Sequence, residues 1–233
     1  MVDLTIIYLT LNSMPDKWYK FAIEHLLKAA GNFPIISISR IPMDLGTNLI
    51  QTEPKSYWNI YMQLLRGSLL ATTDYVANAE DDTLYTKEHF AHFRPPEDKV
   101  SYDMSRWCLF TWDNMYCMRQ RVNNAMLIAP RKLLIEALTE RKTKWPNGYH
   151  HDSLVGEVGR PIVEQNLRVT KREAVQWYCY NPVVQLNHPM NTHGQNARIS
   201  GRPMVKKHGQ IKAYDIPYWG KASDILRYYH AEN

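Results

Sequence analysis

The sequence predicts an α/β fold in which helices flank a mostly parallel central sheet. Three observations near the N-terminus predict it: an apolar, β-branched segment, then an amphipathic segment, then a second apolar segment. A strand buried on both faces of a parallel sheet has such a near-continuous apolar sequence, and parallel neighbouring strands need a crossover helix between them. With 233 residues, 45% of them hydrophobic and 22% charged, the chain is expected to form one domain over residues 1–233.

The first unit is a strand, a helix and a strand. The strands are expected over residues 4–10 and 34–39. Between them, Ser13 and Pro15 are typical of a helix start and Gly31 of a helix end. Apolar residues recur at helical spacing between these signals, at Trp18, Phe21, Ala22, Leu26 and Ala29.

A second helix and a third strand follow a polar connection over residues 42–54. One face of the helix is marked by Trp58, Tyr61, Met62, Leu65 and Leu69. The strand over residues 74–79 ends in three consecutive acids, Glu80, Asp81 and Asp82. Because open α/β sheets bind their ligands at the carboxyl ends of strands, these acids are the first candidate site.

The second half of the chain has a less regular pattern. Strands are expected over residues 107–111, 125–128 and 182–186, with a helix after Pro130. The remaining segments are a polar loop over residues 145–160 and a loop rich in glycine, asparagine and basic residues over residues 187–207.

Composition and cysteine usage limit the class of protein. The net charge of +5 and the pI near 9.0 favour an anionic ligand or partner. Cys108, Cys117 and Cys179 form no CxxC pair, which indicates reduced thiols in a cytosolic setting. No segment approaches the roughly 20 apolar residues that span a bilayer, so we expect a cytoplasmic protein without a membrane span.

The three adjacent acids have two interpretations. Carboxylates at one strand end repel one another unless a cation neutralises them. A divalent cation held by one or two of them would also hold a diphosphate leaving group. The alternative is a solvated acidic turn.

The surrounding sequence favours the metal site. The run from Lys55 to Gln63, the strand from Asp74 and the motif from Glu80 to Tyr85 resemble the GT-A glycosyltransferases, a Rossmann-like family. In that family a helix that begins with polar residues leads into an apolar strand ending in a DxD-like or EDD motif. The resemblance covers roughly residues 4 to 90, with weaker echoes to about residue 195. This chain has the EDD form in place of a strict DxD.

The resemblance implies a reaction and its participants. The chain would move a sugar from a nucleotide-sugar donor, a UDP-sugar, to an acceptor hydroxyl, with Mn²⁺ or Mg²⁺. About residues 1–90 would bind the donor and about residues 91–233 the acceptor. By resemblance, Asp82 is the direct metal ligand, Asp81 contacts the donor sugar or ribose, and Glu80 supports them.

Family members complete the metal site with a late histidine after a strand. His188 and His193 both follow the strand expected over residues 182–186. His188 is nearer the strand end, whereas His193 precedes a glycine that permits close approach to phosphate. The sequence does not choose between them.

The nucleotide pocket is expected at the carboxyl ends of the first two strands. Its candidate residues are Thr10, Leu11, Asn12, Ser39 and Arg40, with Arg198 from the late basic loop added for the donor. Each has the alternative role of a surface turn residue.

An inverting transferase also needs a carboxylate base that takes the acceptor proton. Asp152 and Glu157 follow the acceptor-side helix and are the candidates. A helix-capping role for Asp152 is an equal alternative, and a retaining enzyme would require no such base.

The acceptor is predicted from charge. Arg198, Arg202, Lys206, Lys207 and Lys212 form a basic segment that would follow phosphates. Small bacteriophage GT-A proteins glycosylate hydroxymethylated pyrimidines in duplex DNA, and this chain is similar to them in size. A glycan or lipopolysaccharide acceptor is the alternative, and a non-enzymatic nucleic-acid-binding protein is less favoured because the acids would repel phosphate.

Other site classes are less favoured. His89, His92, His150 and His151 lack neighbouring ligands at the spacing of a zinc site. The sequence has no P-loop, no GxGxxG turn, no GxSxG elbow and no Gly-rich loop of a nucleotidyltransferase after the first strand.

Overall fold

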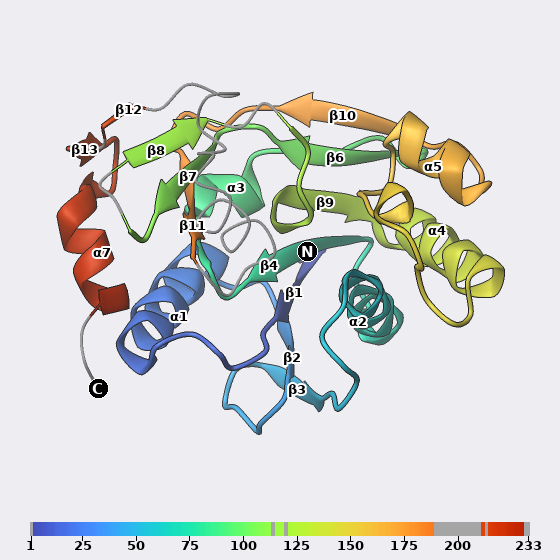
Figure 1. The fold of residues 1–233 in the computed structure, drawn as a ribbon, viewed down its shortest axis with the longest axis horizontal. Coiled ribbons are helices and arrows are strands. Elements are labelled where there is room, and N and C mark those ends of the chain that lie inside the picture. Colours follow the sequence, from blue (N-terminus) through green and yellow to red (C-terminus); the bar gives the residue numbers. More distant parts are fainter. Residues whose placement is uncertain (1, 113–114, 119–120, 189–210, 213, 231–233) are drawn as a thin grey trace.

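The central sheet has seven strands in the order β10-β6-β9-β4-β1-β2-β3. The computed structural model describes residues 2–112, 115–118, 121–188, 211–212 and 214–230 (Figure 1). In chain order the sheet consists of β1 (Leu4–Leu9), β2 (Ile35–Ser39), β3 (Thr47–Ile50), β4 (Tyr75–Glu80), β6 (Lys99–Asp103), β9 (Leu127–Pro130) and β10 (Glu173–Trp177). Only β9 runs antiparallel to its neighbours, β4 and β6. The predicted mostly parallel α/β sheet is therefore confirmed.

A second sheet has five strands in the order β12-β8-β7-β11-β5. Its strands are β5 (Thr83–Leu84), β7 (Arg106–Phe110), β8 (Met115–Met118), β11 (Val183–Asn187) and β12 (Ile211–Lys212). The short β5 follows β4 directly and pairs antiparallel with β11, Thr83 opposite Gln185. This pairing brings the acids at the end of β4 beside a strand that comes late in the chain. A two-stranded ribbon, β13 (Asp215–Ile216) with β14 (Gly220–Lys221), lies near the C-terminus.

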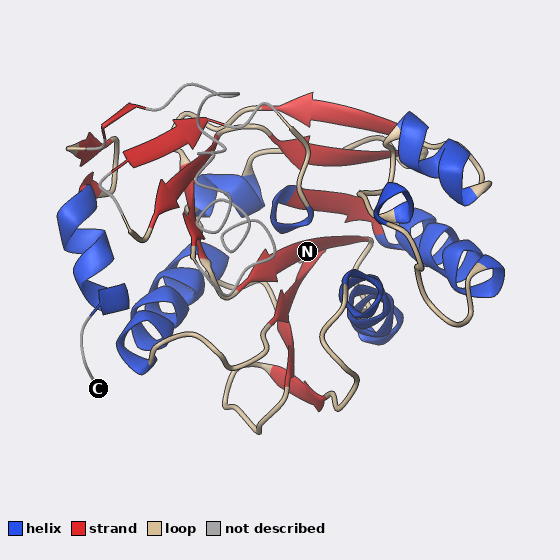
Figure 2. Cartoon of the chain, in the orientation of Figure 1, coloured by secondary structure: helices blue, strands red, loops and turns tan. Residues whose placement is uncertain are grey.

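The helices fall into two groups around the sheets (Figure 2). Their bounds are α1 (Asp16–Ala30), α2 (Tyr57–Leu70), α3 (Lys87–Ala91), α4 (Arg131–Lys144), α5 (Pro161–Leu167) and α7 (Ala222–His230), with the 3₁₀ turns η1 (Asn124–Met126) and η2 (Asp152–Leu154). Helix α1 contacts α3 and α7, whereas α2 contacts α4. Within the described part of the chain, no helix combines the length and the apolarity that crossing a bilayer requires.

The main core forms around β1, which explains its apolar sequence. Leu4, Ile6 and Ile7 are fully buried, because helices cover both faces of this strand. Helix α2 packs very closely on it at Gly67, where an added Cβ would lie 2.5 Å from Cγ2 of Ile7. Ser56 caps the same helix by accepting a hydrogen bond from the backbone N–H of Asn59. The contact at Gly67 therefore holds the last turns of α2 against β1.

The predicted first unit and the predicted acid-bearing strand agree with β1, α1, β2 and β4 to within one or two residues. The edge strand β3, in the polar connection, was not predicted from the sequence, because it is largely exposed and lacks an apolar pattern. Nor were β6, β10, α5 and α7 in the second half. The predicted loop over residues 187–207 lies outside the described residues from position 189 onward.

Candidate active site

The acidic triplet lies at the carboxyl end of β4. Glu80 is the last residue of β4, next to Leu9 at the end of β1, and Asp81 and Asp82 form the turn into β5. The hydroxyl of Thr10 donates to Asp81 Oδ2 at 2.6 Å, and the indole N–H of Trp18 donates to the Asp81 carbonyl oxygen at 2.8 Å. The turn is thereby held to β1 and α1.

Burial makes this cluster of negative charge unfavourable. Asp82 is 6% exposed. Burial, together with the charges of Asp82 and Asp81, raises the pKa of Glu80 to about 8. Burial and the charge of Asp82 also raise the pKa of Asp81 to about 6, although the Thr10 hydrogen bond opposes this rise. A bound cation would remove the repulsion that raises both pKa values.

His188 lies beside the triplet, directly after β11. Its Nε2 is 3.7 Å from Asp82 Oδ2, and the imidazole is buried. Its Nδ1 is buried and has no hydrogen-bond partner among the described residues. One imidazole nitrogen and one carboxylate oxygen therefore face each other, and both could bind a shared metal ion. His193, the other candidate, lies outside the described residues.

One buried residue that the sequence did not point to, Gln185, contacts the acids, and a second, Arg106, holds Gln185. The Gln185 side-chain amide donates to Asp82 Oδ1 at 3.2 Å and to Glu80 Oε2 at 3.4 Å. The side-chain oxygen of Gln185, Oε1, accepts a 2.6 Å hydrogen bond from the Arg106 guanidinium. A polar residue in the centre of the apolar segment Val183–Asn187 was the available signal.

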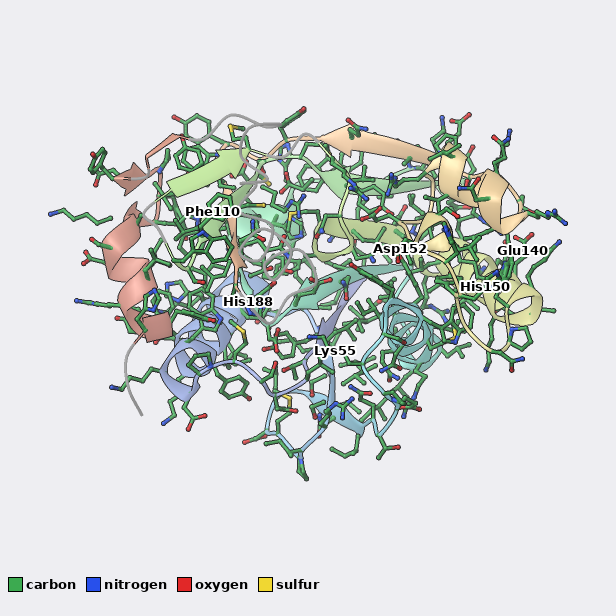
Figure 3. The ribbon with its side chains drawn as sticks, viewed as in Figure 1. Lys55, Phe110, Glu140, His150, Asp152 and His188 are labelled. Atoms are coloured by element: carbon green, nitrogen blue, oxygen red, sulfur yellow. The ribbon has the colours of Figure 1, made fainter. Side chains whose placement is uncertain are left out.

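A cavity of about 600 Å³ opens in front of the acids. It is lined from the ends of β1 and β2, the start of α2, the acidic turn, the loop before η2 and the end of β11. Its described lining comprises Leu9, Thr10, Leu11, Ser13, Ile38, Gln51, Lys55, Ser56, Tyr57, Trp58, Asn59, Ile60, Gln63, Glu80, Asp81, Asp82, Tyr149, His150, His151, Asp152, Val155 and His188. In the view of Figure 3, Lys55 lies between His188 and Asp152.

One wall of the cavity carries a chain of amide groups. Asn59 donates to Gln51 at 3.0 Å, and Gln63 donates to Asn59 at 2.6 Å. Arg66 in turn donates to the Gln63 oxygen at 2.9 Å. This wall was not predicted from the sequence. Its signal was that Asn59 and Gln63 are polar residues spaced four apart, and thus on one face, in an apolar helix.

The predicted nucleotide-pocket residues have different roles. Thr10 and Leu11 line the cavity. Asn12, in the left-handed region with φ 53°, accepts hydrogen bonds from the backbone N–H groups of Arg40 and Ile41. Ser39 is buried and donates to the Ile41 carbonyl, while the Arg40 side chain donates to the Glu53 carbonyl. Asn12, Ser39 and Arg40 therefore shape the edge of the cavity, and none of the three is among its described lining residues. Arg198 lies outside the described residues.

The two candidate bases lie in different surroundings. Asp152 is exposed, begins η2 and lines the cavity. The residue that caps η2 is His151, whose Nδ1 accepts from the backbone N–H of Ser153. Glu157 is buried and accepts a 3.0 Å hydrogen bond from Arg160. Glu157 is not among the described lining residues.

The remaining histidines do not gather in one place. His150 and His151 line the cavity, whereas His89 is fully buried and pairs with Asp103 at 2.9 Å, near Cys179. His89, Asp103 and Cys179 are close enough to share an ion. Burial acts to raise the pKa of Asp103, but hydrogen bonds from His89 and Ser105 outweigh it and lower this pKa to about 2. The carboxylate is thus satisfied by protein donors, and none of the three residues lines the cavity.

Comparisons with known proteins identify the fold. The sequence matches no model of a protein family, and no curated protein matches it. A mannosyltransferase from Pyrobaculum calidifontis, solved with GDP-Man and Mn²⁺, is similar with a TM-score of 0.51 and 12% identity, over 84% of this chain and 59% of that chain. The glycosyltransferase GlyE of Streptococcus pneumoniae, in its apo form, is similar with a TM-score of 0.50 and 10% identity, over 100% of this chain and 61% of that chain.

A nucleotidyl transferase from Methanothermobacter thermautotroptrophicus is also similar, with a TM-score of 0.41 and 15% identity, over 75% of this chain and 87% of that chain. The chain spans about three fifths of the length of the two glycosyltransferases. At these identities the likeness concerns the fold. The GT-A-like fold that the sequence predicted is therefore confirmed.

Proposed function

We propose that this chain is a metal-dependent glycosyltransferase that moves a sugar from a nucleotide-sugar, a UDP-sugar, to an acceptor hydroxyl. The observation that carries this proposal is the 3.7 Å approach of His188 Nε2 to Asp82 Oδ2 at the edge of the cavity. Residues far apart in the sequence supply an imidazole and a carboxylate at the carboxyl edge of a parallel sheet, where α/β proteins bind their ligands.

Asp82 and His188 fit a divalent cation. Carboxylate oxygens suit Mn²⁺ and Mg²⁺, and an imidazole added to them favours a transition metal such as Mn²⁺. Glu80 would support Asp82 from the strand end. When bound, the cation supplies positive charge to the diphosphate that leaves the donor sugar.

The nucleotide would occupy the part of the cavity between β1 and α2. Leu9, Leu11 and Trp58 offer apolar contacts to a base, and the amide groups of Gln51 and Asn59 offer hydrogen bonds to its edge. Asp81, held by Thr10, would contact the ribose or the donor sugar. Residues 1–90 would thus form most of the donor site, and residues 91–233 would contribute His188 and the acceptor side.

Asp152 is the better placed of the two candidate bases, because it lines the cavity and Glu157 is already paired with Arg160. In an inverting reaction Asp152 would take the proton of the acceptor hydroxyl while that oxygen bonds to the anomeric carbon and the nucleoside diphosphate leaves. A retaining reaction would not use this base.

The acceptor that we propose first is a hydroxymethylated pyrimidine in duplex DNA, and a glycan or lipopolysaccharide is the alternative. Of the basic segment proposed to follow phosphates, Arg198, Arg202, Lys206 and Lys207 lie outside the described residues, and the backbone of Lys212 is in β12. Affinity for DNA should fall by orders of magnitude between low and moderate salt, because each neutralised phosphate releases counterions. Flat salt dependence, or transfer to an oligosaccharide alone, would favour the glycan alternative.

The decisive experiment offers UDP- and GDP-sugars with Mn²⁺ and follows release of the nucleoside diphosphate. Hydroxymethylated DNA, unmodified DNA and oligosaccharides serve as acceptors. We expect release from a UDP-sugar that requires Mn²⁺ and increases with one acceptor class. Absence of any Mn²⁺-dependent nucleotide binding would contradict the proposal, and DNA binding without it would support a non-enzymatic role.

A further inference from the structure

We propose that Arg106 and Gln185 form a relay that orients the Asp82 and Glu80 carboxylates for the metal, so that both are positioning residues of the site. This inference rests on the proposed function, because it assigns a role toward the cation that Asp82 and His188 would hold. Arg106 and Gln185 together are called the relay.

The relay is buried beneath the cavity. Arg106 is the first residue of β7 and is 3% exposed, and Gln185 lies in the neighbouring parallel strand β11. The Arg106 guanidinium donates to the Gln185 side-chain oxygen at 2.6 Å and more weakly to the Arg121 carbonyl at 3.4 Å. Hydrogen bonds therefore connect the Arg106 guanidinium to Asp82 and Glu80 through the Gln185 side-chain amide.

Arg106 dictates which way the Gln185 amide points. A guanidinium can only donate hydrogen bonds, so the amide oxygen must face Arg106 and the amide nitrogen must face the carboxylates. The nitrogen lies 3.2 Å from Asp82 Oδ1, 3.5 Å from Asp82 Oδ2 and 3.4 Å from Glu80 Oε2. Without Arg106 the amide could turn over and present its oxygen to the carboxylates of Asp82 and Glu80.

The relay leaves one carboxylate oxygen of Asp82 available. Oδ1 accepts from the Thr83 hydroxyl at 2.8 Å and from Gln185 at 3.2 Å. Oδ2 has only the longer contact with Gln185 and faces His188 Nε2 at 3.7 Å. The donors thus hold the carboxylate plane in the orientation that directs Oδ2 at the proposed metal position.

Arg106 also places a permanent positive charge behind the cluster. Three carboxylates at one strand end repel one another, and a buried cation on the side away from the cavity offsets part of this repulsion. It does so without occupying the position in front of Asp82. The relay would therefore offset the repulsion among the acids and, at the same time, orient Asp82 toward the cation.

The test measures Mn²⁺ affinity directly, in the intact chain with saturating UDP, by titration calorimetry or by the Mn²⁺ magnetic resonance signal. The variant Gln185→Leu removes the amide at similar size. Partners that orient metal ligands typically contribute about 10- to 100-fold to metal affinity, so we expect a loss in this range. With saturating Mn²⁺ the kcat should recover to within a few-fold of wild type, a split that a general loss of folding would not produce.

One control variant in β11 and two substitutions of Arg106 test the same inference. Val184→Ala alters the adjacent, fully buried position on the opposite face of β11 and should lower Tm without changing Mn²⁺ affinity. Arg106→Met should weaken Mn²⁺ binding as Gln185→Leu does, whereas Arg106→Lys should restore part of it. If Gln185→Leu does not fold, Gln185→Met provides the same comparison with a more adaptable side chain.

The outcomes separate the relay from the proposed function. Wild-type protein that binds no Mn²⁺ with UDP would overturn the metal site itself. Wild-type protein that binds Mn²⁺, together with a folded Gln185 variant of equal Mn²⁺ affinity, would overturn the relay and leave the proposed function intact.

Discussion

The Thr10 hydroxyl donates a 2.6 Å hydrogen bond to Asp81 Oδ2 and so joins the carboxyl ends of β1 and β4 through their side chains. The same hydroxyl accepts from the backbone N–H of Asn12 at 2.8 Å. Asn12 in turn accepts from the backbone of Arg40 and Ile41 after β2. A single chain of hydrogen bonds therefore fixes the three strand ends that surround the proposed nucleotide position.

Asp82→Ala is expected to abolish transfer. The cation would supply several kcal/mol of charge stabilisation to the leaving group. Because a tenfold change in rate corresponds to about 1.4 kcal/mol, loss of the ligand should lower kcat/KM by roughly 100-fold or more. Nucleotide binding should also cease to depend on Mn²⁺, while the circular dichroism spectrum is retained. Asp16→Ala, at an exposed position in α1, is the control. Unchanged turnover in the Asp82 variant would remove the metal-site claim.

Of the two late histidines, His188 is expected to be the metal ligand. His188→Ala should weaken Mn²⁺ binding and activity much more than His193→Ala, because the imidazole of His188 already faces Asp82. A single histidine suffices for the proposed coordination. The measurement is the Mn²⁺ concentration that gives half-maximal activity, with His92→Ala at an exposed position as control. A larger loss in the His193 variant would reverse the assignment.

The metal-free protein is expected to lose stability as the pH rises from about 4 to about 8. Burial and neighbouring acids raise the pKa of Glu80 from 4.5 to about 8 and that of Asp81 from 3.8 to about 6. The folded state therefore holds more protons than the unfolded state in this window, and raising the pH favours unfolding. The measurement is Tm against pH.

Two comparisons check the origin of this pH dependence. Glu80→Gln should flatten the decrease in Tm, whereas Glu97→Gln, at an exposed position, should not. Added Mn²⁺ should raise Tm most at the high-pH end, since the ionised carboxylates bind it. A Tm that rises steadily to pH 8 without metal would contradict the prediction.

Asp152→Asn is expected to lower kcat by roughly 10²- to 10⁴-fold, the range of general base catalysis, with little change in donor KM. Glu157→Gln should instead lower Tm, because the ion pair with Arg160 is lost in a buried setting. Steady-state kinetics and thermal unfolding on both variants make the comparison. Small effects of both on kcat would favour a retaining reaction or a different base.

The sequence predicted most of the first half of the fold and the position of the three acids at the end of β4. The apolar run of β1, Pro15 and Gly31 at the two ends of α1 and the three acids after β4 are local patterns, and local patterns report local structure. Ser13, the expected capping residue, does not cap α1. The proximity of Asp82 to His188 was available only through the resemblance to a family.

The rest could not be read from the sequence because it depends on contacts between distant segments. Gln185 meets the acids because β11 pairs with β5, and no local pattern encodes that pairing. Arg106 begins a strand, where an arginine ordinarily faces solvent, and its burial is explained by its hydrogen bond to Gln185 and by the nearby charge of Glu80. The edge strand β3 lacks an apolar pattern because it has little to bury.

The position of β9 in the sheet has a consequence for synthesis of the chain. Once residue 80 has emerged from the ribosome, β1, β2, β3 and β4 are all available, but the outer edge of β4 stays unpaired until Leu127–Pro130 arrives to pair with Tyr75, Val76 and Ala77. An apolar, unpaired edge is a template for association with other nascent chains. The acidic triplet lies at the end of this edge. Its negative charges would repel the same residues of a second copy of the chain. The triplet that would later hold a cation would therefore also oppose association through this edge before the sheet is complete.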